Sequence, residues 1–84
     1  EKRAKDWEGV DEGLFELLRQ KRAQLAQKQG VPAYVIFNDK SLKDMAGRKP
    51  LTAEDFAAVF GVGEHKLKVY AEAFINVVKQ YVVR

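Results

Sequence analysis

Few residues in this chain could perform covalent or acid–base chemistry. His65 is its one histidine, and the chain has no cysteine. No serine accompanies that histidine in a pattern typical of an activated nucleophile, and no glycine-rich loop ends in Lys-Ser or Lys-Thr to hold nucleotide phosphates. One histidine and scattered carboxylates provide no repeated spacing of metal ligands. We therefore expect a domain without catalytic residues, without a metal and without a cofactor.

Acidic residues near the predicted helix starts have a structural explanation. Glu54, Asp55 and Glu64 fall in first turns, where the positive end of the helix dipole favours a carboxylate. We expect these three to be structural, and His65 to be exposed near a helix N-terminus.

Positive charge is concentrated in the middle of the chain. The sequence carries a net charge of +3, but residues 16–49 hold eight basic and three acidic residues, a local excess of five. Residues 1–15 carry a charge of −2, and residues 50–84 sum to zero. A clustered positive field attracts polyanions, although a solvated basic face without a ligand is an equally open alternative.

An aromatic residue, Tyr34, lies within this basic stretch, after a proline that stiffens the chain. Cations for phosphates and an aromatic ring for base stacking are the combination used in sequence-tolerant binding of single strands. Arg19 and Arg22 are neighbours on the predicted first helix, and the stems of Lys21 and Arg22 can pack beside its apolar stripe while their charges reach solvent. The alternative for Tyr34 is an aromatic at the edge of the core with its hydroxyl in water. The candidate nucleic-acid-binding residues are Arg19, Lys21, Arg22, Lys28, Tyr34, Lys40, Lys43 and Lys66.

A glycine turn, Phe60-Gly61-Val62-Gly63, precedes the predicted last helix. A helix, a Gly-hydrophobic-Gly turn and a second helix leave unpaired N–H groups at the helix start, where Lys66 can help to hold a phosphate. The same arrangement occurs as the helix-hairpin-helix of many DNA-binding proteins. The open alternative is that the glycines only permit a tight turn and close helix packing.

Apolar residues at helical spacing predict the elements that position these side chains. A first helix is expected from its N-cap, Asp11, to a C-terminal stop at Gly30. Residues 31–38 are ambiguous, because their β-branched residues favour a strand that would have no partner. A short helical turn or an extended connector is expected there. It should bury one of three apolar residues, Val35, Ile36 or Phe37.

Two capping signatures predict the next helices. Ser41 with Asp44 indicates a short helix over residues 42–47, and Thr52 with Asp55 indicates another through Phe60. A long last helix is expected over residues 64–82, with its apolar stripe toward the core.

Length and composition limit the architecture. Eighty-four residues suffice for one domain with a single core. Residues 1–10 show no apolar periodicity and are interpreted as a linker with Trp7 able to dock back, and residues 11–84 as an all-α, compact bundle of about five helices with short connections. No apolar run approaches the roughly 20 residues of a membrane span, and the lack of cysteine suits a reducing environment. We expect a cytoplasmic monomer.

An ordered series of motifs covers nearly the whole chain. They are Leu14-Phe15-x-x-Leu18-Arg19-x-x-Arg22, Val31-Pro32-x-Tyr34-Val35-Ile36-Phe37-Asn38-Asp39, Leu42-x-x-Met45-Ala46, Pro50-x-Thr52 and Phe60-Gly61-Val62-Gly63-x-x-Lys66-Leu67-x-x-Tyr70. Over about residues 12–82 this series resembles the HRDC domain, the helicase-and-RNase-D C-terminal module. The Val-Pro-x-Tyr-Val-Ile-Phe stretch is more similar to the copies in bacterial RecQ-type DNA helicases than to those in RNase D.

The resemblance implies a five-helix fold and an accessory, non-catalytic role in a nucleoid-associated helicase. Bacterial members of the family bind single-stranded DNA weakly and tune substrate choice for the motor. The family's binding surface carries over to Arg19, Arg22, Tyr34 and the region of Lys40 and Lys43. Lys21 departs from the family, in which this position is often aliphatic or aromatic, so the residue removes an apolar contact or adds charge to the surface.

The expected partners are therefore single-stranded or partly single-stranded DNA and the helicase core of the same chain. Two alternatives stay open. One is a protein-interaction module that docks on the helicase core or on another partner. The other is an RNA-binding module of an RNase D-like enzyme.

Overall fold

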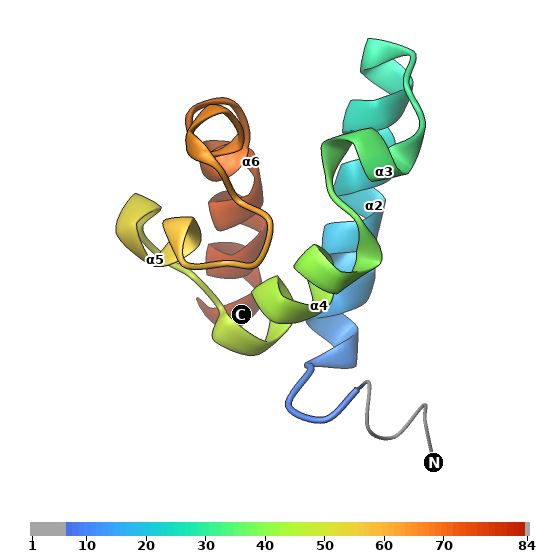
Figure 1. Ribbon diagram of the computed structural model, residues 1–84. Coiled ribbons are helices and arrows are strands. Elements are labelled where there is room, and N and C mark those ends of the chain that lie inside the picture. Colours follow the sequence, from blue (N-terminus) through green and yellow to red (C-terminus); the bar gives the residue numbers. More distant parts are fainter. Residues whose placement is uncertain (1–6, 84) are drawn as a thin grey trace.

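The computed structural model describes residues 7–83 and folds them into helices, with no strand in this range. Short segments connect the helices, and the all-α prediction is confirmed (Figure 1). Residues 1–6 of the predicted linker lie outside the described residues. Within residues 7–83, no helix has both the length and the apolar character needed to cross a membrane. The helices are α2 (Glu12–Gln29), α3 (Ala33–Ile36), α4 (Asp39–Arg48), α5 (Ala53–Ala57) and α6 (Glu64–Val83).

The two long helices, α2 and α6, run antiparallel and form the frame of the domain (Figure 1). At one end the Tyr81 hydroxyl donates to Asp11 Oδ1 at 2.6 Å, and toward the other end Gln29 Nε2 donates to Tyr70 Oη at 3.0 Å. As predicted, Asp11 caps α2 by accepting the Leu14 N–H, and α2 ends at a C-cap glycine in the left-handed conformation. The frame is therefore fixed by hydrogen bonds near both of its ends.

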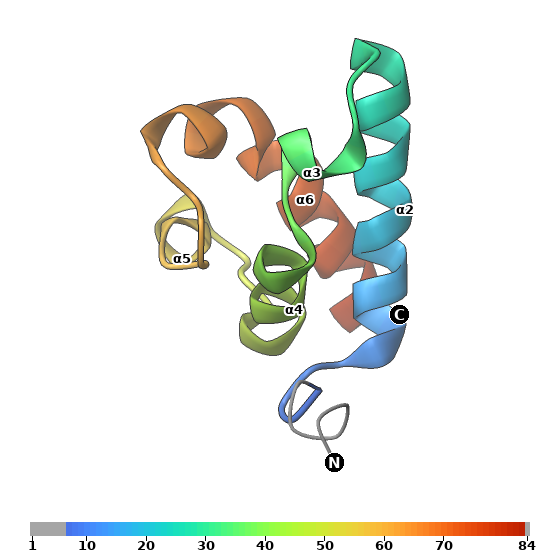
Figure 2. The ribbon, with the colours of Figure 1, turned by 45° about the vertical axis from the view of Figure 1, so that its right-hand side comes forward.

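The shorter helices pack on this frame (Figure 2). Helices α3 and α4 lie against α2, and α5 lies against α6. Thr52 caps α5 as predicted, by accepting the Asp55 N–H on its hydroxyl oxygen. The chain between α2 and α4, residues 31–38, is called the connector below, and it contains the single turn of α3.

Two helix boundaries differ from the prediction. Helix α4 begins at Asp39 because Asn38, not Ser41, is its N-cap: Asn38 Oδ1 accepts the Ser41 N–H at 2.9 Å, and Ser41 is buried inside the helix. Helix α5 ends at Ala57 rather than Phe60. The Phe60 N–H donates to Asp44 Oδ2 of α4 at 2.7 Å and does not continue the helical ladder. Both differences come from side-chain acceptors that compete for backbone N–H groups.

A cluster of aromatic rings anchors the connector in the core. The Phe37 ring is 1% exposed, and its centroid lies 5.3 Å from that of Phe74, 5.8 Å from that of Tyr70 and 6.1 Å from that of Phe56. The three pairs meet edge to face, the geometry that aromatic quadrupoles favour. The connector thus buries Ile36 and Phe37, whereas the third candidate of the prediction, a valine, stays partly exposed. The core position of Phe37 fixes where the rest of the connector lies.

Candidate nucleic-acid interface

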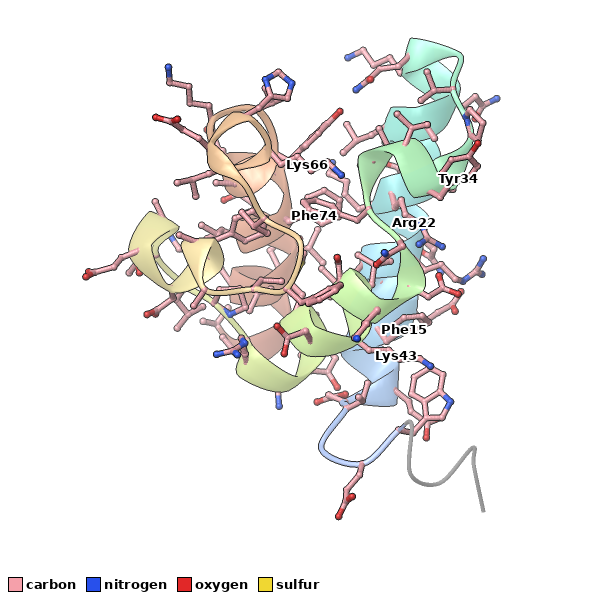
Figure 3. All side chains as sticks on the ribbon, viewed as in Figure 1. Phe15, Arg22, Tyr34, Lys43, Lys66 and Phe74 are labelled. Carbon is pink, nitrogen blue, oxygen red and sulfur yellow. The ribbon has the colours of Figure 1, made fainter. Side chains whose placement is uncertain are left out.

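Tyr34 lies on the outer side of the connector. It is the second residue of α3, two residues after Pro32, which is the extended N-cap residue of this short helix. The Tyr34 side chain is 70% exposed and faces away from the aromatic cluster (Figure 3). The structure therefore places a large ring in solvent on a segment whose next residues are fixed in the core.

Arg22 joins α2 to the connector. Its Nη1 donates to the Phe37 carbonyl at 3.0 Å and to Asp39 Oδ1 at 2.9 Å. Its side chain is only 11% exposed, and its Nε is buried without a hydrogen-bond partner among the described residues. The expectation that the Arg22 charge reaches solvent was wrong, because the connector folds back over α2 and covers the guanidinium (Figure 3). Arg22 holds the connector in place.

Arg19 keeps its charge at the surface and lies near the start of α4. Its Nε and Nη2 donate to the two carboxylate oxygens of Glu16 at 3.0 and 2.7 Å, and both side chains are about half exposed. The Glu16 carboxylate raises the pKa of Arg19, with a smaller contribution from the charge of Asp39, and Arg19 in turn lowers the pKa of Glu16. The ion pair between Arg22 and Asp39, at 2.9 Å, brings the charges of α2 and of the start of α4 together.

Two predicted lysines of α4 lie over aromatic rings. Lys40 Nζ is 4.5 Å from the ring centroid of Phe60, and Lys43 Nζ is 4.6 Å from that of Trp7. Trp7 in turn packs edge-on against Phe15 of α2, with ring centroids 4.8 Å apart. Each ammonium is thus attracted to the negative face of a ring.

The same lysines line an open groove of about 810 Å³, which we call the α4 groove. Its walls come from residues 8–10, from one face of α4 and from the segment after α5, and the residues of the last two parts are Lys40, Lys43, Asp44, Gly47, Arg48, Ala58 and Phe60. Asp44 also lines the groove, and its Oδ2 accepts from Arg48 Nε at 2.9 Å as well as from the Phe60 N–H. The groove therefore combines three cations, one aromatic ring and two carboxylates, of which that of Asp44 already accepts from two donors.

Lys66 approaches the connector from α6. Its Nζ lies 5.0 Å from the ring centroid of Phe37, and Figure 3 shows the residue in the space between α6 and α3. The turn before α6 contains one glycine with a positive φ, Gly61 at 79°, and Gly63 accepts the Leu67 N–H on its carbonyl. Lys66, which was predicted to help this turn to hold a phosphate, therefore lies close to the connector.

Two predicted residues lie apart from the others. Lys21 lines a different groove of about 380 Å³ between α2 and α6, beside Leu17 and Tyr81. Lys28 is exposed in the last turn of α2, where a cation stabilises the negative end of the helix dipole. Among residues 7–83, no three histidine, cysteine, aspartate or glutamate side chains gather as metal ligands.

The structure also adds residues that the sequence did not single out as site residues. Arg48 and Phe60 line the α4 groove, and Trp7 lies beneath one of its lysines. Phe60 had a detectable signal, since it is an aromatic residue directly before a glycine turn. Trp7 was expected to dock back and does pack against Phe15 of α2, but nothing in the sequence indicated that it would lie beneath Lys43.

Comparison with known proteins identifies the family. Residues 11–78 match the model of the HRDC domain. A protein named ATP-dependent DNA helicase RecQ from Bacillus subtilis is 40% identical over 68 residues, and one of the same name from Pasteurella multocida is 39% identical over 71. These matches cover 81% and 84% of this chain but only 12% and 11% of the two relatives.

A solved structure shares the fold. It is described as D. radiodurans RecQ HRDC domain 3, and it superposes with a TM-score of 0.79 at 32% sequence identity. The match covers 82% of this chain and 91% of that one. The chain therefore belongs to the HRDC domain family, which its bacterial relatives carry as a small part of a much longer helicase.

Proposed function

We propose that this chain is the non-catalytic accessory domain of a RecQ-like DNA helicase, in which it binds single-stranded or partly single-stranded DNA. Binding is weak, has no strong sequence preference and tunes the choice of substrate by the motor. The observation that carries the proposal is Tyr34, a ring 70% exposed on a connector that Arg22 and Phe37 hold in place. An exposed ring on a connector held to the core suits base stacking, which every base permits.

In the proposed interface, residues stack on a base, contact phosphates or position the connector. Tyr34 stacks on a base, and the cations that surround the connector and follow it on α4 contact phosphates. Arg22 positions the connector. Lys21 and Lys28 add to the field from a greater distance. The phosphate-contacting residues of this proposal are Arg19, Lys40, Lys43 and Lys66.

The glycine turn before α6 adds a secondary contact in this proposal. A helix-hairpin-helix-like turn at Gly61 to Gly63 supplies backbone N–H groups to one phosphate, with Lys66 beside it. Because few phosphates are contacted in total, affinity is low. Affinity also falls as salt rises, because log K declines by about 0.7 per phosphate contact for each tenfold rise in salt on single strands.

A titration of a fluorescently labelled oligothymidylate at low and high salt tests the proposal. Tyr34→Ala should weaken binding by about 1–3 kcal/mol, and Tyr34→Phe should retain most of the affinity because the ring remains. Val35→Ala, on the same turn and 43% exposed, is the matched control. Absent binding at low salt, or binding insensitive to salt, would contradict the electrostatic mechanism.

The competing function, docking on the helicase core or another protein, has its own structural basis. The groove between α2 and α6 is lined by the partly exposed Leu17 together with glutamines and Lys21. Chemical-shift mapping separates the two functions. Shifts caused by DNA around Arg19, Tyr34 and Lys43 support DNA binding, whereas shifts caused by the helicase core and centred on Leu17 support docking.

A further inference from the structure

The α4 groove contains an exposed aromatic ring that the proposed interface at Tyr34 does not use. Phe60 is 46% exposed at the wall of the groove, although a buried position would stabilise so large an apolar side chain more. Its backbone is held firmly, because its N–H donates to Asp44 at 2.7 Å. Phe60 is therefore a positioned ring and not a side chain on a loose loop.

The charges of the groove favour an anionic occupant. Lys40, Lys43 and Arg48 bring three cations to its walls, with Lys40 directly over the Phe60 ring. Of the two acidic residues that line it, Asp44 is shared between two donors, and Glu8 is exposed on the N-terminal segment. The lining therefore has a net positive charge and also exposes the apolar ring of Phe60.

The groove also lies close to the connector along the chain. Lys40 follows Tyr34 by six residues, a segment that can extend over at most about 20 Å. It is in the first turn of α4, next to the Asp39 that Arg22 binds. A strand bound at Tyr34 can therefore extend to Lys40 and the groove.

We propose that the α4 groove is a second nucleotide subsite, in which a base of single-stranded DNA stacks on Phe60 and the flanking phosphates contact Lys40 and Lys43. This inference rests on the proposed function, because the occupant is the strand that binds at Tyr34. The subsite extends the interface from the connector across α4. An acidic peptide, the other anion that carries apolar groups, is an outcome of the test below.

The 84-residue chain allows a direct test with two readouts. The first is the anisotropy of a labelled oligothymidylate of roughly 16 nucleotides, long enough for both subsites. The second is the emission of Trp7, the sole tryptophan of the chain, whose ring lies under Lys43. Phosphate contact with Lys43 should change this emission. Far-UV circular dichroism and the thermal midpoint confirm that each variant is folded.

Phe60→Ala should raise the dissociation constant at least about fivefold, as expected for the loss of one stacked base. Phe60→Tyr, which keeps a ring, should bind within about twofold of the wild type. The matched control is Leu51→Ala, because Leu51 is similarly exposed at 42% but does not line the groove. In the wild type, Trp7 emission should change along the same binding curve as anisotropy.

Three outcomes overturn the inference, and they are distinguishable. If Phe60→Ala binds like Leu51→Ala while Tyr34→Ala still weakens binding, the groove subsite is wrong and the proposed function stands. If the wild type does not bind DNA at low salt, the proposed function itself fails and the subsite with it. If Phe60→Ala weakens binding of a glutamate- and phenylalanine-containing peptide but not of DNA, the groove is a peptide site.

Discussion

Replacement of Arg22 by methionine should destabilise the domain and weaken DNA binding through the connector. Methionine keeps an unbranched apolar stem on α2 but removes the guanidinium. The variant therefore loses the hydrogen bonds to the Phe37 carbonyl and to Asp39 without a large change in packing volume. Arg19→Met removes one positive charge from the same helix and is the matched control.

The expected magnitude follows from the burial of each partner. The bond to the Phe37 carbonyl is buried and charge-assisted, so its loss costs about 1.5–3 kcal/mol. The ion pair with Asp39, whose side chain is 67% exposed, adds at most about 1 kcal/mol. The Nε of Arg22 is buried without a hydrogen-bond partner, so its removal offsets roughly 1 kcal/mol of this loss of stability. The net decrease in the free energy of unfolding is about 0.5–3 kcal/mol, whereas the loss of the exposed Arg19 ion pair should have a smaller effect.

Thermal denaturation followed by circular dichroism measures this difference. A domain of this size loses about 4–8 °C in Tm per kcal/mol, so Arg22→Met should melt well below Arg19→Met. Binding of labelled oligothymidylate supplies the second comparison, in which Arg22→Met should lose more affinity than Arg19→Met because Tyr34 is no longer held. Equal midpoints for the two variants would refute the reasoning, because the buried carbonyl bond would then contribute nothing.

Two further substitutions test features of the frame and of the glycine turn. The pKa of Asp11 is lowered chiefly by the hydrogen bond from Tyr81. The ionised carboxylate therefore stabilises the folded domain at neutral pH, and this stabilisation is lost as the pH falls below about 4 and through the folded-state pKa. Urea titrations across pH should show that the difference in the free energy of unfolding between the wild type and Asp11→Asn disappears at acid pH. A difference that does not change with pH would contradict this. Gly61→Ala should cost about 1–2 kcal/mol, because φ is 79° and the added Cβ would lie 2.6 Å from a buried serine oxygen. Gly63→Ser, where nothing lies within 4 Å of an added Cβ, should be nearly neutral, and equal melting points for the two glycine variants would argue against strain at Gly61.

The elements predicted best are those whose signals are local. Asp11 and Thr52 accept N–H groups three residues ahead, and Gly30 ends α2 in the left-handed conformation. Such signals involve residues close in sequence, so they can be detected without knowledge of the fold. The long apolar stripe of α6 was equally evident, and the helix ends only one residue beyond the expected bound.

The features that could not be predicted depend on contacts between distant residues. Asn38 and Ser41 are both good capping residues, and the fold decides between them by burying Ser41 inside the helix while Asn38 accepts its N–H. The early end of α5 depends on Asp44, sixteen residues before the N–H that it accepts. The same holds for the site: sequence identified Arg22 as a cation, but only the fold shows that the connector covers it.

The lysines that lie over aromatic rings also bear on how readily the surface can order around a ligand. A lysine free in solvent loses up to about 2 kcal/mol of rotamer entropy when it is fixed in one conformation. Lys40, Lys43 and Lys66 each have Nζ within 5.0 Å of a ring centroid, so part of that freedom is already lost in the folded domain. A phosphate that meets these ammonium groups orders them less than it would order free side chains. In the proposed interface, Trp7 would therefore influence affinity without touching a base, because its ring restricts the conformations of Lys43 above it.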